Sequence, residues 1–306
     1  MQTAAIEQRL LMGLPAEMIR KNEPMASHTT FRIGGPCDLF ISPETEEQIV
    51  FCIQTLRQMG VPMLVMGNGS NMLVRDGGVR ACVVKINSSG AEIRVDRQAK
   101  TLYAGAGESM MAIANRCIQE GLTGQEFASG IPGTLGGAVM MNAGAYEHEI
   151  GEIIQSVRVL TKEGEVREVS QADMHFGYRT SAATTNQWVV LGATLQLQQA
   201  EPEQVKAKVA DFTRRRRAKQ PLMYASAGST FKRPQGHFAA KLIDDAGLKG
   251  ASVGQAQVSE MHAGFVINRG GASAKEVLAL MKQIQQTVQE RFGVTLQPEV
   301  KIIGED

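Results

Sequence analysis

Apolar residues recur at helical spacing at the start of the chain and in short runs after it. Residues 3–22 predict an amphipathic packing helix through Ile6, Leu10, Leu14 and Met18. A strand ending at Ile41 follows, and Thr45 with Gln48 forms a capping-box pattern that predicts a helix ending near Gly60. Further apolar runs predict strands at 61–66 and 83–86. These elements form a first small α/β unit.

The pattern repeats with different lengths up to residue 199. It predicts a helix over 109–119 that ends at Gly121, and Lys162-Glu163-Gly164 favours a hairpin turn. The predicted strands cover residues 91–95, 101–104, 156–160, 166–169 and 188–198. A second mixed unit therefore follows the first.

The character of the chain changes at Glu201. A charged helix over 203–219 ends in four consecutive arginines, Arg214 to Arg217. These cover every helix face, so most must be solvated, although one or two could reach an anionic ligand. A polar turn at 227–234 and a helix through Leu242 and Ile243 come next; Ser273 with Glu276 opens the last long helix, and a strand ends the chain at 296–303. We expect an α+β protein with units at 1–86, 87–199 and 200–306.

Composition narrows the class of protein. At 306 residues, 43% hydrophobic and 21% charged, the chain is typical of a globular protein. Lys plus Arg (32) balances Asp plus Glu (31), so no global field favours nucleic acid. The four cysteines are far apart without a CxxC pair, which argues against a zinc site or disulfide framework. Glu7 and Arg9 interrupt any signal peptide, and no run reaches membrane-spanning length. We expect a cytoplasmic, metal-free monomer.

Two glycine-rich segments carry the candidate chemistry. Residues 67–71, GNGSN, follow an apolar strand, and residues 130–146 read GIPGTLGGAVMMNAGAY. Glycine N–H groups can form nests for phosphates, and small residues leave room beside the chain for a flat ring system. The alternative is a tight internal turn built from small residues.

Generic motif searches exclude several sites. The Rossmann pattern GxGxxG fails because Met72 and Met110 stand where the third glycine would be. There is no Gly-Lys dipeptide for a P-loop, no HExxH metal motif and no GxSxG nucleophile elbow. The remaining candidates are an Arg in a turn, a Ser in a turn and a Glu at the start of a strand. Composition alone does not show that they form one site.

An ordered series of motifs resembles the UDP-N-acetylenolpyruvoylglucosamine reductases. The series covers nearly the whole chain in the family's order and spacing, and the direct run from FGYRTS into the Trp188 strand is similar to the shorter, type II form. Besides the two glycine-rich segments, its motifs are TTFRIGG at 29–35, FGYRTS at 176–181, AGSTFKRP at 227–234, KLIDDAGLKG at 241–250, HAGFVIN at 262–268 and PEVKIIG at 298–304.

The resemblance implies an FAD-binding fold of the PCMH or vanillyl-alcohol-oxidase type, with two α/β subdomains and a C-terminal α/β substrate-binding domain. The first glycine-rich loop would cradle the pyrophosphate and the second would lie along the flavin and its ribityl chain. Neither His nor Cys occurs at 67–71, so we expect noncovalent FAD. The implied cofactor residues are Gly67, Asn68, Gly69, Ser70, Asn71, Gly130, Ile131, Pro132, Gly133, Thr134, Gly136, Gly137, Asn142, Ala143, Gly144 and Ala145.

The family's reaction has two halves. NADPH reduces the flavin, which then delivers hydride to C3 of the enolpyruvyl ether of UDP-N-acetylglucosamine enolpyruvate. By resemblance, Arg179 binds the substrate carboxylate, Glu299 acts with it on the enolate, and Ser229 donates a proton to C2. A planar guanidinium suits a carboxylate, and an enolate needs positive charge and acidic hydrogen bonds.

The substrate contacts implied by resemblance are Tyr178, Lys219 and Arg233. The chain departs from the family where FKRP replaces FKNP, which puts a cation at Arg233, and where AYEHEIGE replaces AYGGEIGD. Two alternatives remain: a noncatalytic flavin- or nucleotide-binding relative, and a sugar oxidase of the same fold. An inactive relative has no reason to retain Arg179, Ser229 and Glu299 together, and an oxidase would consume oxygen without requiring NADPH.

Overall fold

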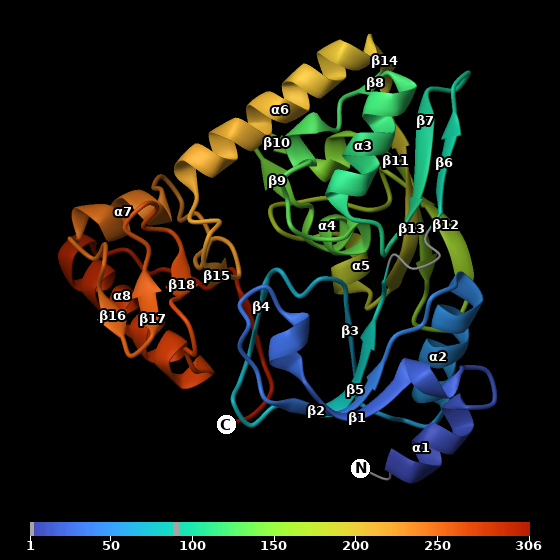
Figure 1. Cartoon of the computed structure of the whole chain (residues 1–306), viewed down its shortest axis with the longest axis horizontal. Coiled ribbons are helices and arrows are strands. Elements are labelled where there is room, and N and C mark those ends of the chain that lie inside the picture. Colours follow the sequence, from blue (N-terminus) through green and yellow to red (C-terminus); the bar gives the residue numbers. More distant parts are fainter. Residues whose placement is uncertain (1–2, 88–91) are drawn as a thin grey trace.

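The structure is a computed structural model that describes residues 3–87 and 92–306. Figure 1 shows an α/β unit in blue to cyan below a second in green to yellow, with a third in orange to red beside them. The long helix α6 (Pro202–Lys219) runs from the second unit to the third. None of the helices in these two ranges is long and apolar enough to cross a membrane.

The first unit is built on a sheet with strand order β1-β2-β5-β3. Strand β1 runs antiparallel to β2, whereas β2, β5 and β3 are parallel neighbours. The capping box of Thr45 and Gln48 is confirmed at the start of α2. The bounds are α1 Thr3–Leu10, β1 Ile19–Pro24, β2 Pro36–Ile41, α2 Glu46–Gln58, β3 Met63–Met66, β4 Met72–Val74 and β5 Val79–Lys85, with short 3-10 turns η1 Ala16–Met18 and η2 Met25–His28.

The helix expected over residues 3–22 is wrong in its second half. Helix α1 ends at Leu10, and the strand β1 begins at Ile19. Gly13 and Pro15 interrupt the helix, and β1 then pairs with β2. The spacing misled because Leu14 and Met18 are buried in the core although both lie beyond the end of α1, Met18 in the short 3-10 turn η1.

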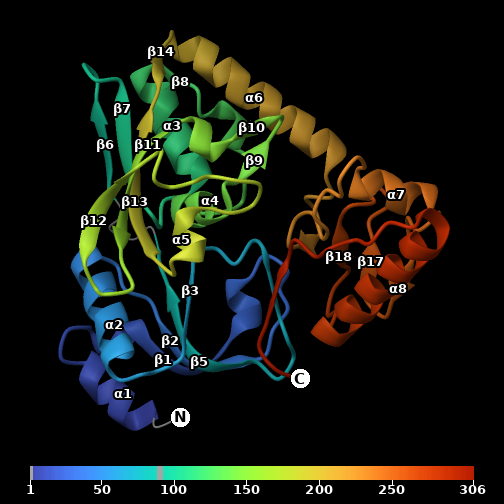
Figure 2. The same ribbon diagram turned by 180° about the vertical axis from the view of Figure 1, so that it is seen from behind.

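The second unit has an antiparallel sheet of order β12-β11-β13-β7-β6, visible from behind in Figure 2. The hairpin predicted around Lys162-Glu163-Gly164 joins β11 to β12. Helix α3 ends at Gly121, which has φ +64 as expected for a glycine cap. The principal bounds are β6 Ile93–Asp96, β7 Thr101–Gly105, α3 Met110–Glu120, β8 Leu122–Thr123, η3 Glu126–Ala128, α4 Leu135–Met141, β9 Gly144–Ala145, β10 His148–Glu149, η4 Ile150–Glu152, β11 Ile154–Leu160, β12 Val166–Ser170, α5 Ala182–Thr185, β13 Val189–Gln196 and β14 Gln198–Gln199. Ala91, the predicted start of β6, lies outside the described residues.

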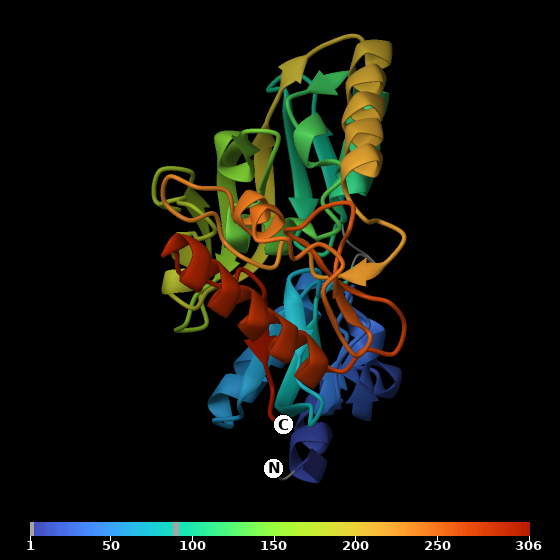
Figure 3. The ribbon, with the colours of Figure 1, turned by 90° about the vertical axis from the view of Figure 1, so that its left-hand side faces the viewer.

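The third unit combines a small antiparallel sheet of order β15-β18-β17-β16 with two helices, and α8 lies in front of it in Figure 3. The predicted Ser273–Glu276 capping box is confirmed at the start of α8. Its core also contains Phe31 and Leu73 from the first unit. The bounds are β15 Ala225–Ser226, α7 Ala239–Asp245, β16 Ser252–Val253, β17 Ala256–Val258, β18 Val266–Asn268, α8 Ala274–Phe292 and β19 Lys301–Ile303.

The end of the chain returns to the first unit. Strand β19 pairs in parallel with β4, and Lys301 lies opposite Met72. Asp76 accepts hydrogen bonds from the N–H groups of Ala274 and Lys275, so the first unit also caps α8. We propose the division after residues 86 and 199 for the folded protein, with residues 301–303 returning to the first unit. This return places the residue before β19 close to the loop between β3 and β4.

The four cysteines are free and buried. Burial raises the pKa of the Cys52 and Cys82 thiols to about 12, so they stay protonated and behave as small apolar core residues.

Candidate functional site

The loop from Gly67 to Asn71 follows β3 and presents its main chain. Within the described part of the chain, none of the backbone N–H groups of these five residues donates a hydrogen bond. Gly69 has φ +60, a conformation that favours glycine. Adjacent N–H groups without intervening side chains can form a nest for anions. The loop therefore fits the phosphates of a cofactor.

The stretch from Gly130 to Tyr146 meets this loop directly. Asn68 Nδ2 donates a hydrogen bond to the Pro132 carbonyl oxygen at 3.2 Å. A Cβ on Gly67 would lie 2.2 Å from Thr134 Oγ1, and one on Gly133 would lie 3.4 Å from Ser70 Oγ. The two glycine-rich segments are thus neighbours in space, and a side chain at Gly67 would separate them.

Some glycines in these segments are required by contacts with the protein itself. A Cβ on Gly136 would lie 2.9 Å from the Cβ of Ala106, and the Gly136 N–H donates to the Ala106 carbonyl oxygen at 2.8 Å. A Cβ on Gly69 would lie 2.4 Å from the His28 carbonyl oxygen. The tight-turn alternative accounts for these two positions, whereas the unpaired N–H groups of residues 67–71 indicate a ligand.

Arg179 is presented by a tight turn. Gly177 and Thr180 exchange backbone hydrogen bonds of 3.1 and 3.2 Å, which close the turn around Tyr178 and Arg179. Arg179 has φ +58, which costs free energy in a residue other than glycine and is often found at functional sites. Its guanidinium carbon lies 4.9 Å from the centre of the Tyr178 ring. The turn therefore fixes both side chains at one edge of the second unit.

Arg179 forms an ion pair with Glu299 across 120 residues of sequence. The Nε to Oε1 distance is 2.8 Å, and the two side chains are 19% and 14% exposed. A Cβ on Gly144 would lie 3.4 Å from Arg179 Nη1, so this nitrogen lies beside the second glycine-rich segment. Within the described residues neither Nη group pairs with a carboxylate. The guanidinium retains donors for an anionic ligand.

Glu299 is held from both sides. Asn71, in the first glycine-rich loop, donates through Nδ2 to the Glu299 carbonyl oxygen at 3.2 Å. The Glu299 N–H donates to the Thr230 carbonyl oxygen at 2.9 Å. The cofactor loop and the turn that contains Ser229 therefore fix the same carboxylate-bearing residue, a role of Asn71 that no local sequence motif signals.

Ser229 is exposed on a supported turn next to Glu299. The Thr230 N–H donates to the Gly264 carbonyl oxygen at 2.9 Å, and Thr230 Oγ1 accepts from the Val266 N–H at 3.0 Å. Thr230 is thereby fixed, and the preceding Ser229 remains exposed. Ser229 and Glu299 are thus held together by backbone contacts through Thr230.

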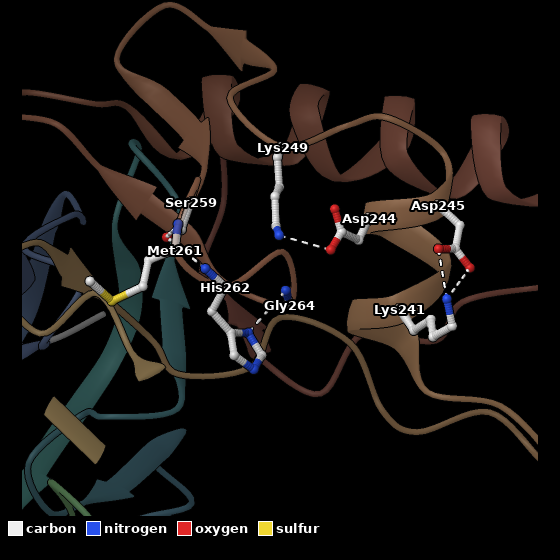
Figure 4. A network of polar contacts seen from close by, with 8 residues as sticks. All are labelled: Lys241, Asp244, Asp245, Lys249, Ser259, Met261, His262 and Gly264. Carbon is white, nitrogen blue, oxygen red and sulfur yellow. Dashed lines mark hydrogen bonds and ion pairs between the residues drawn. The ribbon is translucent and has the colours of Figure 1, made fainter. Parts of the chain in front are cut away.

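His262 supports the turn of Ser229 and Thr230 through Gly264. Its Nδ1 accepts a hydrogen bond from the Gly264 N–H at 3.2 Å, and Ser259 Oγ accepts from the N–H groups of Met261 and His262 (Figure 4). Burial lowers the pKa of His262, in keeping with a neutral ring that accepts at Nδ1. The motif HAGFVIN contains this histidine but does not indicate such a role.

Asn142 has contacts within the protein besides its expected place beside the cofactor. Its side-chain amide donates to Glu149 Oε2 at 2.8 Å and to the Gly177 carbonyl oxygen at 3.1 Å, and its oxygen accepts from the Gly151 N–H at 3.0 Å. These protein contacts engage the amide, so its side chain orients the Arg179 turn. The side-chain oxygen keeps a second acceptor position, for which the described residues provide no donor.

The substrate-contact residues fall into two groups. Tyr178 Oη accepts a hydrogen bond from the Arg233 N–H at 3.0 Å, and the Arg233 guanidinium carbon lies 4.0 Å from the centre of the Phe238 ring. The hydrogen bond between Arg233 and Tyr178 joins the second and third units beside Arg179. Lys219 is exposed at the end of α6 and makes no ion pair within the described residues.

The departure at AYEH has a visible backbone consequence. Tyr146 and Glu147 form the turn between β9 and β10, with φ +55 and +67. Glycine adopts this region without cost, whereas Glu147 must be strained there. The turn nevertheless closes the β9–β10 hairpin, in which His148 pairs with Ala145.

Comparisons with known proteins define the class first. Residues 37–170 match the family described as an FAD binding domain. The alkyldihydroxyacetonephosphate synthase structure superposes with a TM-score of 0.51 at 16% identity, covering 65% of this chain and 41% of that one, which shows a shared fold. The chain is an FAD-binding flavoprotein of the PCMH-type fold, as predicted.

The chain belongs to the UDP-N-acetylenolpyruvoylglucosamine reductase family. Residues 220–303 match the C-terminal domain of this reductase. The Clostridium tetani enzyme is 46% identical over 97% of this chain and 96% of its own length. The crystal structure of the Thermus caldophilus enzyme superposes with a TM-score of 0.78 at 32% identity, covering 94% of this chain and 98% of that one. The family assignment from sequence is confirmed.

Proposed function

We propose that Arg179, Glu299 and Ser229 carry out the second half of the family reaction. The protein is an FAD-dependent oxidoreductase that reduces UDP-N-acetylglucosamine enolpyruvate to UDP-N-acetylmuramate in peptidoglycan synthesis, with NADPH as the electron donor. The observation that carries the assignment of roles is the Arg179–Glu299 pair, formed beside both glycine-rich segments.

FAD, when bound, takes up hydride from NADPH and passes it to C3 of the enolpyruvyl ether. The residues present fit this cofactor. Unpaired N–H groups from Gly67 to Asn71 suit its pyrophosphate, and the small residues from Gly130 to Ala145 leave room for its ring. Binding through these segments is noncovalent in our proposal.

Arg179 binds the substrate carboxylate. Hydride addition at C3 places negative charge on C2 and, by delocalisation, on the carboxylate oxygens. The guanidinium keeps its Nη donors for those oxygens because Nε is held by Glu299. Glu299 therefore orients the guanidinium and, lying against it, faces the same intermediate.

Ser229 donates the proton that C2 requires. Its hydroxyl is exposed on a turn fixed through Thr230, and that turn adjoins Glu299. A serine hydroxyl is a weak acid, but the carbanion at C2 is a strong base, and the Arg179 cation favours negative charge nearby. Tyr178, Arg233 and Lys219 contact the nucleotide sugar in this proposal.

The experiment separates the two half-reactions in stopped-flow flavin absorbance. Ser229→Ala should leave flavin reduction by NADPH near the wild-type rate and slow reoxidation by the enolpyruvyl substrate about 100-fold or more. Arg179→Lys should slow the same step because a point charge cannot replace the planar fork. Equal losses in both halves for either variant would contradict the assigned roles.

We further propose that the enzyme acts as a cytoplasmic monomer. Four free, buried cysteines suit a reducing compartment, and the substrate carboxylate site is built from one chain. Sedimentation of the FAD-loaded protein should give one species near 33.1 kDa. A dimer at micromolar concentration would contradict the monomer.

A further inference from the structure

The four consecutive arginines at the end of α6 have different environments. Arg214 and Arg215 both form ion pairs with Asp211, one turn earlier on the same helix. Arg217 is exposed. These three follow the expectation of a solvated, charged helix end.

Arg216 does not follow it. It is half-buried, and a Cβ on Gly130 would lie 2.9 Å from Arg216 Cδ and 3.6 Å from Nη1. Within residues 3–87 and 92–306 its guanidinium makes neither an ion pair nor a hydrogen bond. The side chain thus lies against the first residue of the second glycine-rich segment with its donors unpaired.

The other end of that segment is also held on α6. Tyr146 Oη donates to the Phe212 carbonyl oxygen at 2.9 Å, and the two rings lie 4.6 Å apart. Phe212 and Arg216 are four residues apart, which places them on the same face of the helix. One face of α6 therefore carries both ends of the stretch from Gly130 to Tyr146.

A half-buried guanidinium without a counter-charge is costly. Burial lowers the pKa of Arg216, but a guanidinium stays protonated, so the charge itself remains in a poorly solvated place. An anionic or electron-rich ligand group would offset that cost. Arg214 and Arg215 have Asp211 for this purpose, whereas Arg216 has none in the described chain.

We propose that Arg216 supplies positive charge to the ring system of bound FAD and thereby makes the flavin easier to reduce. This inference rests on the proposed course of the flavin along Gly130–Tyr146. Hydride uptake adds two electrons and one proton to an oxidised flavin, so the ring gains one net negative charge. A fixed cation stabilises that charge.

The ring is favoured over the pyrophosphate by the contacts of the two segments. Residues of the phosphate loop meet the second segment at Pro132, Gly133 and Thr134. Arg216 meets it earlier, at Gly130. The cation is therefore offset from the place where the N–H nest of residues 67–71 lies.

The test is the midpoint potential of the bound flavin, measured by dye-coupled reduction of the holoenzyme. Arg216→Ala should shift the equilibrium toward oxidised flavin about tenfold, or about 30 mV for a two-electron couple. Arg216→Lys should fall between wild type and Arg216→Ala. The matched control Arg217→Ala removes an exposed cation from the adjacent position and should leave the potential at the wild-type value.

The dissociation constant of sulfite is a second measurement of the same effect, and it does not require turnover. Sulfite adds to flavin N5 and also leaves negative charge on the ring, so its dissociation constant should rise about tenfold in Arg216→Ala, as the potential shift requires. If Arg216→Ala does not fold, Arg216→Gln is measured with the same expectations.

Two results would overturn the inference. One is a potential and sulfite affinity in the Arg216 variant equal to those of Arg217→Ala. The other is weaker FAD retention with an unchanged potential, which would assign Arg216 to the pyrophosphate. Ser229→Ala, assayed alongside, should leave the potential unchanged and slow only substrate reduction. Failure at Arg216 is therefore distinguishable from failure of the proposed function.

Discussion

The proposed cofactor region and the proposed substrate-reducing region of this protein are built in different ways. The cofactor region consists of two continuous segments, Gly67–Asn71 and Gly130–Tyr146, and offers mainly backbone N–H groups and small residues. The substrate-reducing region consists of the side chains of Arg179, Ser229 and Glu299, which come from distant parts of the chain. The cofactor region requires the first two units to meet, whereas the substrate-reducing region exists only once all three units have packed.

This difference separates the expected consequences of mutation. A change in a glycine-rich segment should weaken FAD binding and so impair both half-reactions. A change in the three side chains should impair only the second half. Asn71 belongs to both regions, because it lies in the phosphate loop and binds the backbone of Glu299.

Among the variants that compare the two regions, Glu299→Gln should have the largest effect. The amide cannot hold the Arg179 guanidinium as an ion pair, so flavin reoxidation by the enolpyruvyl substrate should slow about 100-fold, while reduction by NADPH stays near wild type. Stopped-flow absorbance measures both. Glu305→Gln is the matched control, since the side chain of Glu305 is 60% exposed. Loss of NADPH reactivity in Glu299→Gln would show that the regions are not separate.

Gly67→Ala should chiefly damage the cofactor region. Its Cβ would lie 2.2 Å from Thr134 Oγ1 and force the two segments apart, at a cost of about 1–3 kcal/mol. Equilibrium dialysis should show weaker FAD binding. Gly133→Ala places a Cβ at an ordinary contact of 3.4 Å from Ser70 Oγ, and any steric effect should be smaller. Equal FAD affinities of the two variants would refute the close-contact argument.

Asn71→Ala should affect both regions. It removes the hydrogen bond to the Glu299 carbonyl oxygen, with a net value of about 0.5–1.5 kcal/mol, so the second half-reaction should slow several-fold. Asn68→Ala is the comparison, because its side chain binds the Pro132 carbonyl oxygen within the cofactor region. It should weaken FAD binding without slowing substrate reduction in FAD-saturated enzyme. The reverse pattern would contradict the assignment of Asn71 as the bridge.

Glu108 should make the stability of the cofactor region depend on pH. Its side chain is buried at the turn before α3, and burial raises its pKa above the ordinary value of 4.5. The folded state therefore holds this proton more tightly, so its stabilising contribution is complete below pH 4.5 and is lost as the pH rises through the raised pKa. Glu108→Gln should gain stability at pH 7 in urea unfolding, and the gain should vanish below pH 4.5. A gain of equal size at both pH values would refute the titration.

The smallest effect is expected at the β9–β10 turn. Glu147 has φ +67, so Glu147→Gly should relieve strain and raise the free energy of unfolding by about 0.5–1 kcal/mol. Glu147→Ala keeps the Cβ and should give no such gain. Thermal unfolding of both variants is sufficient to compare them. A destabilised glycine variant would show that contacts of the Glu147 side chain outweigh its strain.

Local patterns predicted much of the fold because their causes are local. The capping boxes at Thr45 and Ser273 and the glycine cap at Gly121 are formed by residues a few positions apart. Helical spacing misled over residues 3–22, where Leu14 and Met18 are buried by tertiary packing outside any α-helix. Period alone does not specify which neighbour covers an apolar side chain.

The sequence predicted which residues belong to the site, but not the contacts between them. Motifs named Arg179 and Glu299, but their ion pair depends on β19 returning to β4. The hydrogen bonds from Asn71 to Glu299 and from Asn142 to the Gly177 turn cross sequence distances that no local pattern reports. Likewise, the sequence does not distinguish among the four adjacent arginines. The structure does, because only Arg216 is shown to lie against Gly130.

The most direct measurement is a crystal structure of the FAD-loaded enzyme with the enolpyruvyl substrate bound. We expect the substrate carboxylate within about 3 Å of the Arg179 Nη atoms, with the Ser229 hydroxyl directed at C2 and Glu299 still bound to Nε. A carboxylate bound elsewhere, with Arg179 and Ser229 remote from the enolpyruvyl group, would contradict this expectation.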